Sequence, residues 1–249
     1  MPAETTPIVK PPSFRVSDAL VEQEPNVALH RFTACTPTCL LGVEQFLAVH
    51  RLLPPCSQGR KWQLVYSSDD HGFGFSALQR CCQPSPSNHY IKDGVCVLVV
   101  HAAGETLVGA ILSNLPILDT SNRKRYFGTA STSVFRFITV DGNNKDDVVR
   151  QEKTRVQHYP SASPKVNDYY ISAANERVSV GGGGAGPALQ LTDDMSYVAS
   201  SSQCDTFGPS FRSLLDKTCA GVEVEGGECR ATNIKIELWK ISEFAVSIS

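Results

Sequence analysis

Three serines, a cysteine and an aspartate are concentrated in residues 200–208, SSSQCDTFG. Cys204 or a neighbouring serine could act as a nucleophile if a base lay within hydrogen-bond reach. His71 is the best-placed base, because it lies in the polar segment SSDDHGFGFS rather than in a strand pattern. The cluster has neither a G-x-S-x-G turn nor a cysteine-protease signature, and such clusters mostly satisfy backbone groups in turns. We therefore expect no catalytic residues and keep as the alternative an enzyme that uses Cys204 and His71, either a Cys- or Ser-nucleophile hydrolase or a thiol-based antioxidant.

The cysteines give no pattern for redox or metal chemistry. Asp205 next to Cys204 raises rather than lowers the pKa of the thiol, which argues against a peroxide-scavenging thiolate. The pairs at 35 and 39 and at 81 and 82 have no second Cys/His pair at zinc spacing. We expect neither a metal nor a cofactor.

The stretch VSVGGGGAGPALQL, residues 178–191, has five glycines in six positions. Gly181, Gly183 and Gly186 satisfy the dinucleotide pattern G-x-G-x-x-G, but that pattern must open a helix. Here Pro187 follows at once and the next residues alternate as a strand does. Glycine permits positive φ angles and close approach of neighbouring groups. We interpret the run as a crowded bend between strands, with structural glycines at Gly181, Gly182, Gly183, Gly184 and also Gly208.

The elements that carry these segments are mainly strands. The apolar run 94–102 predicts a central strand buried on both faces, with 106–113 as its hairpin partner. In 61–68 the alternation predicts Trp62, Leu64 and Tyr66 on one face. No helical pattern long enough for βαβ crossovers separates the strands. The sequence predicts a mainly β (α+β) fold, a two-sheet antiparallel β-sandwich flanked by a few helices. The further predicted strands are 126–129, 133–140, 168–173, 177–180, 187–192 and 234–241.

Two helices are expected beside the sheets. Thr36-Pro37 has the form of a helix start, and apolar residues at helical spacing continue until Pro54-Pro55. The segment 76–79, SALQ, has the form of a capping box at the start of a second, short helix. Both helices need an apolar surface to cover.

Length and composition favour one domain. The chain has 249 residues, and β domains of this length occur as single units. We expect a flexible N-terminal arm over 1–33, a single domain over 34–249, and a loop over 141–166 that resembles an insertion. The net charge of −2 gives no attraction to nucleic acid or anionic membrane, and no apolar stretch is long enough to span a bilayer. Without a secretion signal, a cytoplasmic location is expected.

Taken in order, the motifs resemble the TLDc domain family of oxidation-resistance proteins. The resemblance runs from about Thr36 to Ile241. Its departures are Asp205 where the family usually has Glu, Pro209 where it usually has Asn, and Ala185-Gly-Pro187 after the glycines. The motifs that carry it are LLPP, WQLVYSSDDHGFGFSALQR, GETLVGAILS, YFGT, SVFRF, NDYYISAANERVSVGGGG, LQLTDDM, SSSQCDTFG and IKIELWKI.

The resemblance implies a non-catalytic protein that protects cells against oxidative stress. Several members of the family bind the peripheral catalytic sector of the vacuolar-type proton-pumping ATPase (V-ATPase) and alter its assembly or activity. For this chain it implies the V-ATPase as partner, with recruitment to acidic organelles and without membrane insertion. The expected contact surface is a polar rim formed by His71, Arg123, Lys124, Arg125, Asp205, Thr206 and Phe207.

Overall fold

The computed structural model describes residues 40–83, 93–102, 106–117, 126–140, 153–174, 176–192, 194–215, 217 and 221–241. The predicted arm over 1–33 and the basic run 123–125 lie outside these residues. The described strands form two six-stranded sheets, in agreement with the predicted antiparallel β-sandwich.

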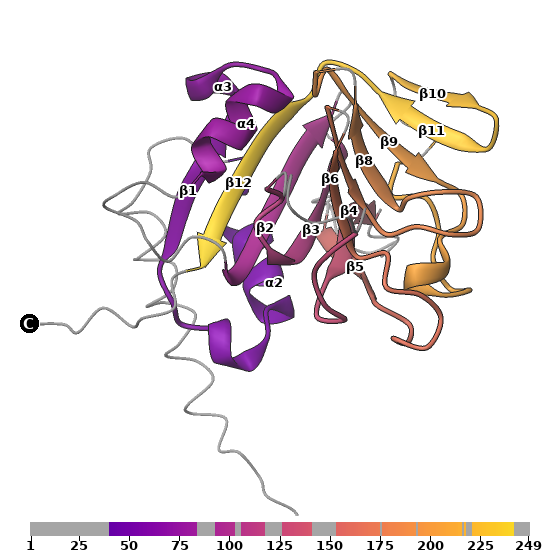
Figure 1. The fold of residues 1–249 in the computed structure, drawn as a ribbon, viewed down its shortest axis with the longest axis horizontal. Coiled ribbons are helices and arrows are strands. Elements are labelled where there is room, and N and C mark those ends of the chain that lie inside the picture. Colours follow the sequence, from indigo (N-terminus) through magenta and orange to yellow (C-terminus); the bar gives the residue numbers. More distant parts are fainter. Residues whose placement is uncertain are drawn as a thin grey trace, which may run out of the picture.

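The first sheet, sheet A, has the strand order β1-β12-β2-β3-β4-β5, and all its pairings are antiparallel. The C-terminal strand β12 is therefore inserted between two N-terminal strands, as Figure 1 shows in yellow. The bounds are β1 Trp62–Ser67, β12 Lys235–Ile241, β2 Asp93–Ala102, β3 Thr106–Asn114, β4 Ser133–Val140 and β5 Lys153–Pro160.

The second sheet, sheet B, has the order β10-β11-β9-β8-β7-β6 and is also antiparallel. Consecutive strands are neighbours throughout β6 to β9, so this part is a meander. The bounds are β6 Ile171–Ala174, β7 Arg177–Val180, β8 Leu189–Thr192, β9 Tyr197–Ser201, β10 Val222–Glu225 and β11 Glu228–Ala231.

The main core lies between the two sheets. Leu98 and Val100 of β2 and Leu238 of β12 face Val180 and Leu191 of sheet B in one continuous buried cluster. Helix α4 (Phe75–Cys82) closes one edge of this core through Leu78 and Cys82, which are fully buried. The α4 side chains are therefore part of the sandwich core rather than a separate layer.

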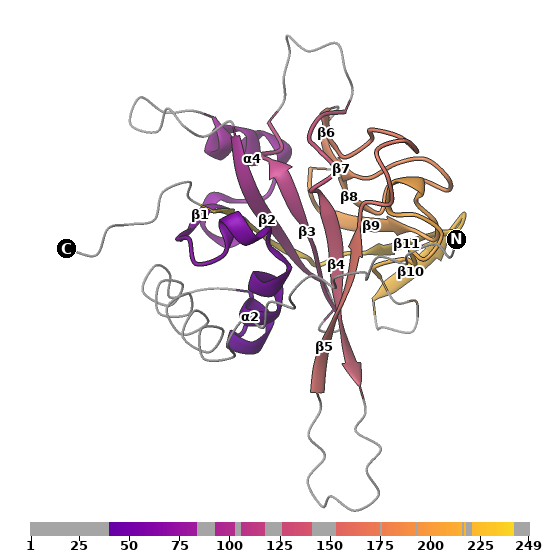
Figure 2. The ribbon, with the colours of Figure 1, turned by 90° about the horizontal axis from the view of Figure 1, so that it is seen from below.

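The other face of sheet A is covered by helix α2 (Val43–Leu52), so the layers are α2, sheet A and sheet B (Figure 2). Phe46 of α2 packs edge-on against Trp62, with 4.8 Å between the ring centroids. Val97 and Val99 of β2 belong to this second cluster, whereas Leu98 and Val100 belong to the first. Strand β2 is thus buried on both faces, and the prediction for 94–102 and its hairpin partner is confirmed.

Strand β1 contains a bulge that the sequence did not reveal. Leu64 pairs with Trp239 and Tyr66 pairs with Leu238, so the register shifts by one residue between them. A shift of one residue moves the following side chains to the other face. Trp62 therefore packs under α2 while Tyr66 packs in the sandwich core. The prediction that all three residues share a face holds for Trp62 and Leu64, which pack in the same cluster, and is wrong for Tyr66.

Both predicted helices begin at other residues than expected: α2 begins later than Thr36-Pro37, and α4 begins one residue before the predicted capping box. Residues 40–42 are not helical, and α2 starts after Gly42, whose N–H donates to the Oε1 atom of Gln45 at 2.7 Å. The predicted start at 36–37 lies outside the described residues, but a helix continuous from there is excluded. Helix α4 starts after Gly74, and Gln79 donates its Nε2 hydrogen to the Pro116 carbonyl at 2.7 Å instead of capping. The capping-box prediction for 76–79 is therefore wrong.

Four strands of the structure were not predicted as strands. Within the predicted loop 141–166, residues 153–160 form β5, and whether 141–166 is an insertion stays a prediction. Strands β9, β10 and β11 were not predicted at all. Residues 126–129 form only an isolated bridge between Phe127 and Ile171. The predicted strands at 168–173 and 187–192 begin later, at Ile171 and Leu189, and the other predicted strands agree with the structure.

A buried glutamate of sheet A forms a hydrogen bond with the backbone of the segment before α2. Glu237 of β12 is only 4% exposed. Its Oε2 atom accepts hydrogen bonds from the Leu40 N–H at 3.1 Å and from the Trp239 Nε1–H at 3.0 Å. One buried acceptor thus binds both donors, so Glu237 stabilises the chain entry to α2 and the position of the indole ring.

We expect Glu237→Ala to lower the free energy of unfolding by about 1–3 kcal/mol, since the buried Trp239 Nε1–H and the half-buried Leu40 N–H lose their acceptor. Glu237→Gln keeps a side-chain oxygen acceptor and should cost less. Glu223→Ala, at an exposed glutamate of β10, is the matched control and should change stability by less than about 0.5 kcal/mol. Urea unfolding followed by tryptophan fluorescence measures all three. An equal loss of unfolding free energy for Glu237→Ala and Glu223→Ala would contradict a stabilising role of the Glu237 hydrogen bonds.

Candidate functional site

The glycine run connects β7 to β8 at one end of sheet B. Opposite it lies the segment 203–208, which follows β9 and contains the short 3-10 helix η3 (Asp205–Phe207). The Thr206 N–H donates to the Gly182 carbonyl at 3.3 Å. The glycine run and residues 203–208 therefore form one structural unit, although they are about twenty residues apart in sequence.

The first two glycines lie under side chains. A Cβ atom at Gly181 would come within 2.6 Å of the Phe207 ring and within 2.7 Å of the Cys204 Sγ atom. A Cβ atom at Gly182 would lie 3.1 Å from Tyr169. A side chain cannot be added at Gly181 without displacing the core residues Cys204 and Phe207, which are 2% and 3% exposed.

The next two glycines carry the Asp205 side chain. Gly183 and Gly184 have φ angles of +78° and +62°, which L-residues rarely adopt. A Cβ atom at Gly183 would lie 2.7 Å from the Asp205 Oδ2 atom. Asp205 is itself exposed. The turn thus lets an acidic side chain lie across its backbone while the carboxylate stays open to solvent.

A polar network around Thr206 locks the two segments together. Its Oγ1 atom accepts from the Gly182 N–H at 3.0 Å and donates to the Asn167 Oδ1 atom at 2.9 Å. Asn167 in turn donates its Nδ2 hydrogen to the Gly182 carbonyl at 3.4 Å. Thr206 is 2% exposed, so its bond with the Gly182 N–H is shielded from water, while the bonds of Asn167 are partly buried. The end of the sandwich is therefore held rigidly.

A cavity of about 340 Å³ opens beside this unit. Cys204 and Phe211 form buried parts of its lining, while Asp205 and Val166 are exposed. Val166 is 55% exposed and Tyr169, next to the glycines, is 41% exposed. Asp205 is the one carboxylate among the residues that line this cavity, and most of the others are apolar, with Gln203 as a further polar residue. This mixture is typical of a protein contact rather than of a metal or phosphate site.

Cys204 is not a prepared nucleophile. Burial raises the pKa of its thiol, and hydrogen bonds from Thr206, Phe207 and Gly182 only partly oppose this. The Sγ atom donates to the Gly182 carbonyl at 3.6 Å. The raised pKa agrees with the expectation from the sequence, but its cause is burial and not the neighbouring Asp205. At neutral pH the sulfur is a protonated thiol.

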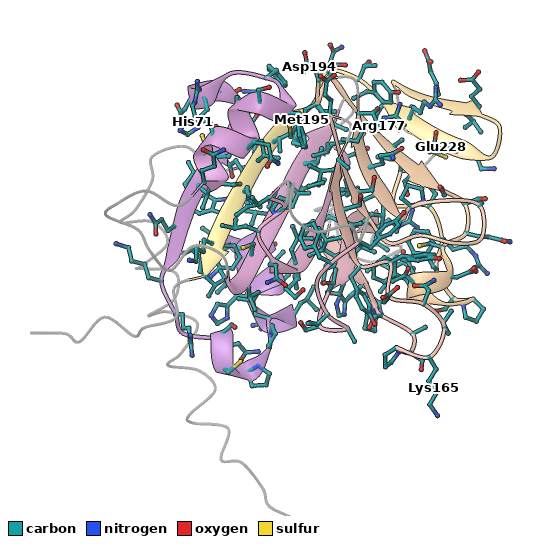
Figure 3. All side chains as sticks on the ribbon, viewed as in Figure 1. His71, Lys165, Arg177, Asp194, Met195 and Glu228 are labelled. Carbon is teal, nitrogen blue, oxygen red and sulfur yellow. The ribbon has the colours of Figure 1, made fainter. Side chains whose placement is uncertain are left out.

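His71 is not the base of Cys204. It ends α3 (Ser68–His71), where its Nδ1 atom accepts from the Ser67 N–H at 3.1 Å and its ring stacks on Tyr66. Gly74, just after it, lies near Asp194 in the β8–β9 turn, whereas Cys204 follows the other end of β9. Figure 3 shows His71 and Asp194 at one end of the molecule and Lys165, next to the Cys204 cavity, at the other. A strand length of roughly 15 Å separates them, so the Cys204–His71 pairing is wrong.

The predicted rim is only partly a surface. Asp205 is exposed, but Thr206 and Phe207 are buried, so they support the surface from below and do not present side chains to a partner. His71 is exposed at the opposite end and cannot share one rim with Asp205. The predicted contact residues Arg123, Lys124 and Arg125 lie outside the described residues. Contact of any of these residues with a partner stays a prediction.

Sequence reasoning missed three residues of this site, Asn167, Tyr169 and Tyr126. The Tyr126 and Tyr169 rings stack with their centroids 4.7 Å apart, and Tyr169 covers Gly182. The signal was present in the motifs NDYY and YFGT, but the predicted strands 168–173 and 126–129 included both tyrosines. An Asn–Asp pair before two aromatic residues is more typical of a turn.

No metal site or membrane helix is found in the described part of the chain. No group of three or more His, Cys, Asp or Glu side chains there is arranged to hold a metal ion. Among the described helices, none combines the length and apolar character that a membrane span requires. Cys35 and Cys39 lie outside the described residues. Cys82 is buried, which raises the pKa of its thiol to about 12.

Comparison with known proteins places this architecture in a family. The sequence model of the TLDc domain matches residues 35–242, which include every described strand of both sheets. The chain belongs to the TLDc domain family. The steric unit formed by the glycine run and residues 203–208 is therefore a feature of a TLDc domain.

Two curated relatives of this TLDc chain are amphibian proteins. Oxidation resistance protein 1 of Xenopus laevis is 28% identical over 193 residues, which is 77% of this chain and 19% of the relative. Oxidation resistance protein 1 of Xenopus tropicalis is 27% identical over 188 residues, 75% of this chain and 18% of the relative. The chain thus spans about a fifth of the length of these relatives.

We expect Gly181→Ala to destabilise the TLDc domain by about 2–4 kcal/mol, through backbone strain and collision with Phe207 and Cys204. Gly59→Ala is the matched control, because Gly59 has a similar φ of +74° but nothing within 4 Å of the added Cβ atom. It should cost only the strain, about 1–2 kcal/mol. Thermal and urea unfolding measure the difference. Equal costs would show that crowding at Gly181 contributes nothing.

We expect the buried thiols to resist alkylation at pH 7.5. Cys56 is exposed, whereas Cys82 and Cys204 are buried with raised thiol pKa values. Because the thiolate is the reactive form, both should react at least about tenfold more slowly than Cys56. Iodoacetamide labelling with peptide mass spectrometry measures the rates, and labelling in urea provides the unfolded control. Labelling of Cys204 as fast as Cys56 in the folded protein would restore a reactive-thiol function.

Proposed function

We propose that this TLDc protein is a non-catalytic binding module that docks on the peripheral catalytic sector of the V-ATPase and regulates its assembly or activity. Through this regulation it contributes to resistance against oxidative stress. The observation that carries the proposal is the match of the TLDc domain to residues 35–242. The name of the two amphibian relatives, oxidation resistance protein 1, supports the physiological part.

The absence of a prepared nucleophile near the glycine run supports a binding role over a catalytic one. Within the described residues, Cys204 is buried, its thiol pKa is raised, and its neighbours are Gly181, Gly182 and Phe207 rather than a base. The rigid network around Thr206 holds the surface in one conformation. Rigid surfaces lose less conformational entropy on binding, which favours recognition of a macromolecule.

The surface proposed for docking is the end of the sandwich around Asp205. Asp205 has no ion-pair partner among the described residues, and Val166 and Tyr169 are large exposed apolar side chains close to it. A cationic group of the partner would pair with the carboxylate while the apolar side chains exclude water. On this proposal the protein works at the cytoplasmic face of acidic organelles, where the pump's peripheral sector lies.

We expect Asp205→Asn and Val166→Asp to weaken co-purification of V-ATPase peripheral subunits from cell lysate by about tenfold each, since each removes one part of the surface. Both side chains are exposed, so the fold should be retained. Glu223→Gln, the same kind of charge loss on β10, is the control and should bind as the unchanged protein does. ATP hydrolysis by membranes supplied with each purified variant measures the effect on the pump.

Two outcomes contradict the proposal at different levels. A pull-down at low salt that lacks every pump subunit rejects the V-ATPase as partner. Binding that survives both substitutions rejects the Asp205 surface while leaving the partner in place. Binding through an exposed carboxylate should also weaken as salt rises, because exposed charges are screened beyond about 10 Å at 0.1 M.

A further inference from the structure

A second cavity, of about 270 Å³, lies on the outer face of sheet B. Its floor is formed by Ser172 of β6, Ser179 of β7 and Gln190 of β8, which are direct neighbours across the three strands. The residues that alternate with them, such as Val180 and Leu189, point into the sandwich core. The floor residues therefore face away from the core, into the cavity.

The floor presents hydrogen-bond donors. Gln190 donates its Nε2 hydrogen to the Ser179 Oγ atom at 2.9 Å, so the Ser179 hydroxyl proton is directed to another acceptor. The Ser172 hydroxyl has no hydrogen bond to the described residues. Ser172 and Ser179 are only 6% and 8% exposed, so the part of each residue that is accessible faces the cavity they line. A ligand oxygen at the floor could accept a hydrogen bond from either hydroxyl in place of water.

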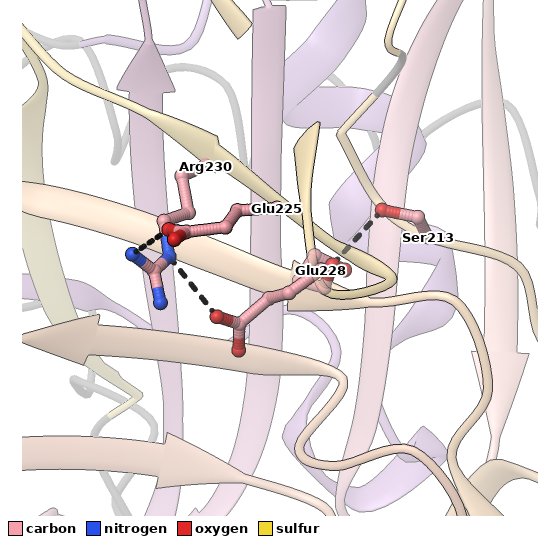
Figure 4. A network of polar contacts seen from close by, with 5 residues as sticks. Ser213, Glu225, Glu228 and Arg230 are labelled. Carbon is pink, nitrogen blue, oxygen red and sulfur yellow. Dashed lines mark hydrogen bonds and ion pairs between the residues drawn. The ribbon is translucent and has the colours of Figure 1, made fainter. Parts of the chain in front are cut away.

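A cation stands at the edge of this cavity. Arg177 of β7 lines it and is exposed, and no carboxylate of the described residues forms an ion pair with its guanidinium group. Arg230 lies on the same face of sheet B, but its guanidinium group forms ion pairs with Glu225 at 2.9 Å and Glu228 at 3.1 Å (Figure 4). The charge of Arg230 is therefore satisfied within the protein, and the charge of Arg177 is available.

One side of the cavity is formed by an aromatic side chain that packs on a second aromatic ring outside the lining. Tyr126 lines the cavity and stacks on Tyr169, while Pro187 lines it from the chain that follows the glycine run. The Tyr126 and Pro187 side chains have few rotatable bonds, so the cavity keeps its shape when empty. A preformed cavity with convergent donors is the usual form of a small-ligand site.

We propose that this cavity binds a carboxylate group, with Arg177 as its ion-pair partner and the Ser172 and Ser179 hydroxyls as further donors. The guanidinium fork matches the two oxygens of a planar carboxylate. One arginine balances one negative charge, whereas a phosphate monoester carries between one and two, and Arg177 is the one cation among the residues that line this cavity. The proposal does not depend on V-ATPase binding, because the cavity lies on the sheet face and not around Asp205.

The test is titration of the full-length protein with acetate, succinate and inorganic phosphate, followed by amide NMR shifts and calorimetry. Acetate and succinate should shift the amides of residues 172, 177, 179 and 190. Arg177→Gln should weaken succinate binding by about tenfold or more, as expected for loss of a charged hydrogen-bond partner. Arg230→Gln, which removes the same charge elsewhere on the face, should leave succinate binding unchanged. Ser172→Ala should weaken it several-fold.

Two short peptides identify the source of the carboxylate. One carries a single glutamate and the other carries glutamine at that position, with both ends blocked. Binding of the glutamate peptide alone assigns the cavity to an acidic side chain of a protein partner, and binding of only the free acids assigns it to a small metabolite. Tighter binding of phosphate than of succinate, or equal binding by the unchanged protein and Arg177→Gln, overturns the proposal.

Discussion

Burial of sheet A on both faces is the constraint on which the rest of the molecule depends. Its inner face packs against sheet B, and its outer face packs under α2 through Trp62, Trp239 and Phe46. Among the described residues, the central strands of sheet A therefore present few side chains to a partner. The ends of the sandwich and the outer face of sheet B are the more accessible surfaces of the described part of the chain. Both candidate sites of this TLDc protein lie in those places.

The two sites differ in what makes them rigid. At the end of the sandwich, side chains of residues 204–207 occupy the space that glycines 181–184 leave free, and the buried Thr206 network joins the two segments. On the outer face, a regular strand register sets the spacing of Ser172, Ser179 and Gln190. The first surface is apolar with one carboxylate, whereas the second is rich in donors with one cation. Their ligands should accordingly have opposite charge.

Strong local patterns of apolar residues predicted most strands of sheet A, but they predicted few strand boundaries in the rest of the chain. The apolar run at β2 and its hairpin with β3 were predictable because burial on both faces leaves a continuous apolar signal. Strand β5 was assigned to a loop because its residues Lys153–Pro160 are largely polar, as an edge strand permits. Strand β9 was missed because its alanine and serines pack in place of larger apolar residues. The bulge in β1 places Tyr66 on the face opposite to the predicted one. Alternation of apolar and polar residues cannot reveal an extra residue in a strand.

The sequence alone determined the antiparallel sandwich, the need for glycine between β7 and β8, and the family, because these follow from periodicity, backbone sterics and ordered motifs. Tertiary structure alone decided that Thr206 and Phe207 are buried, that His71 lies far from Cys204, and that Arg177 stands unpaired beside two serines. The reason is physical. Which side chains meet across strands depends on register and on sheet packing, and both are set by contacts between segments that are distant in sequence.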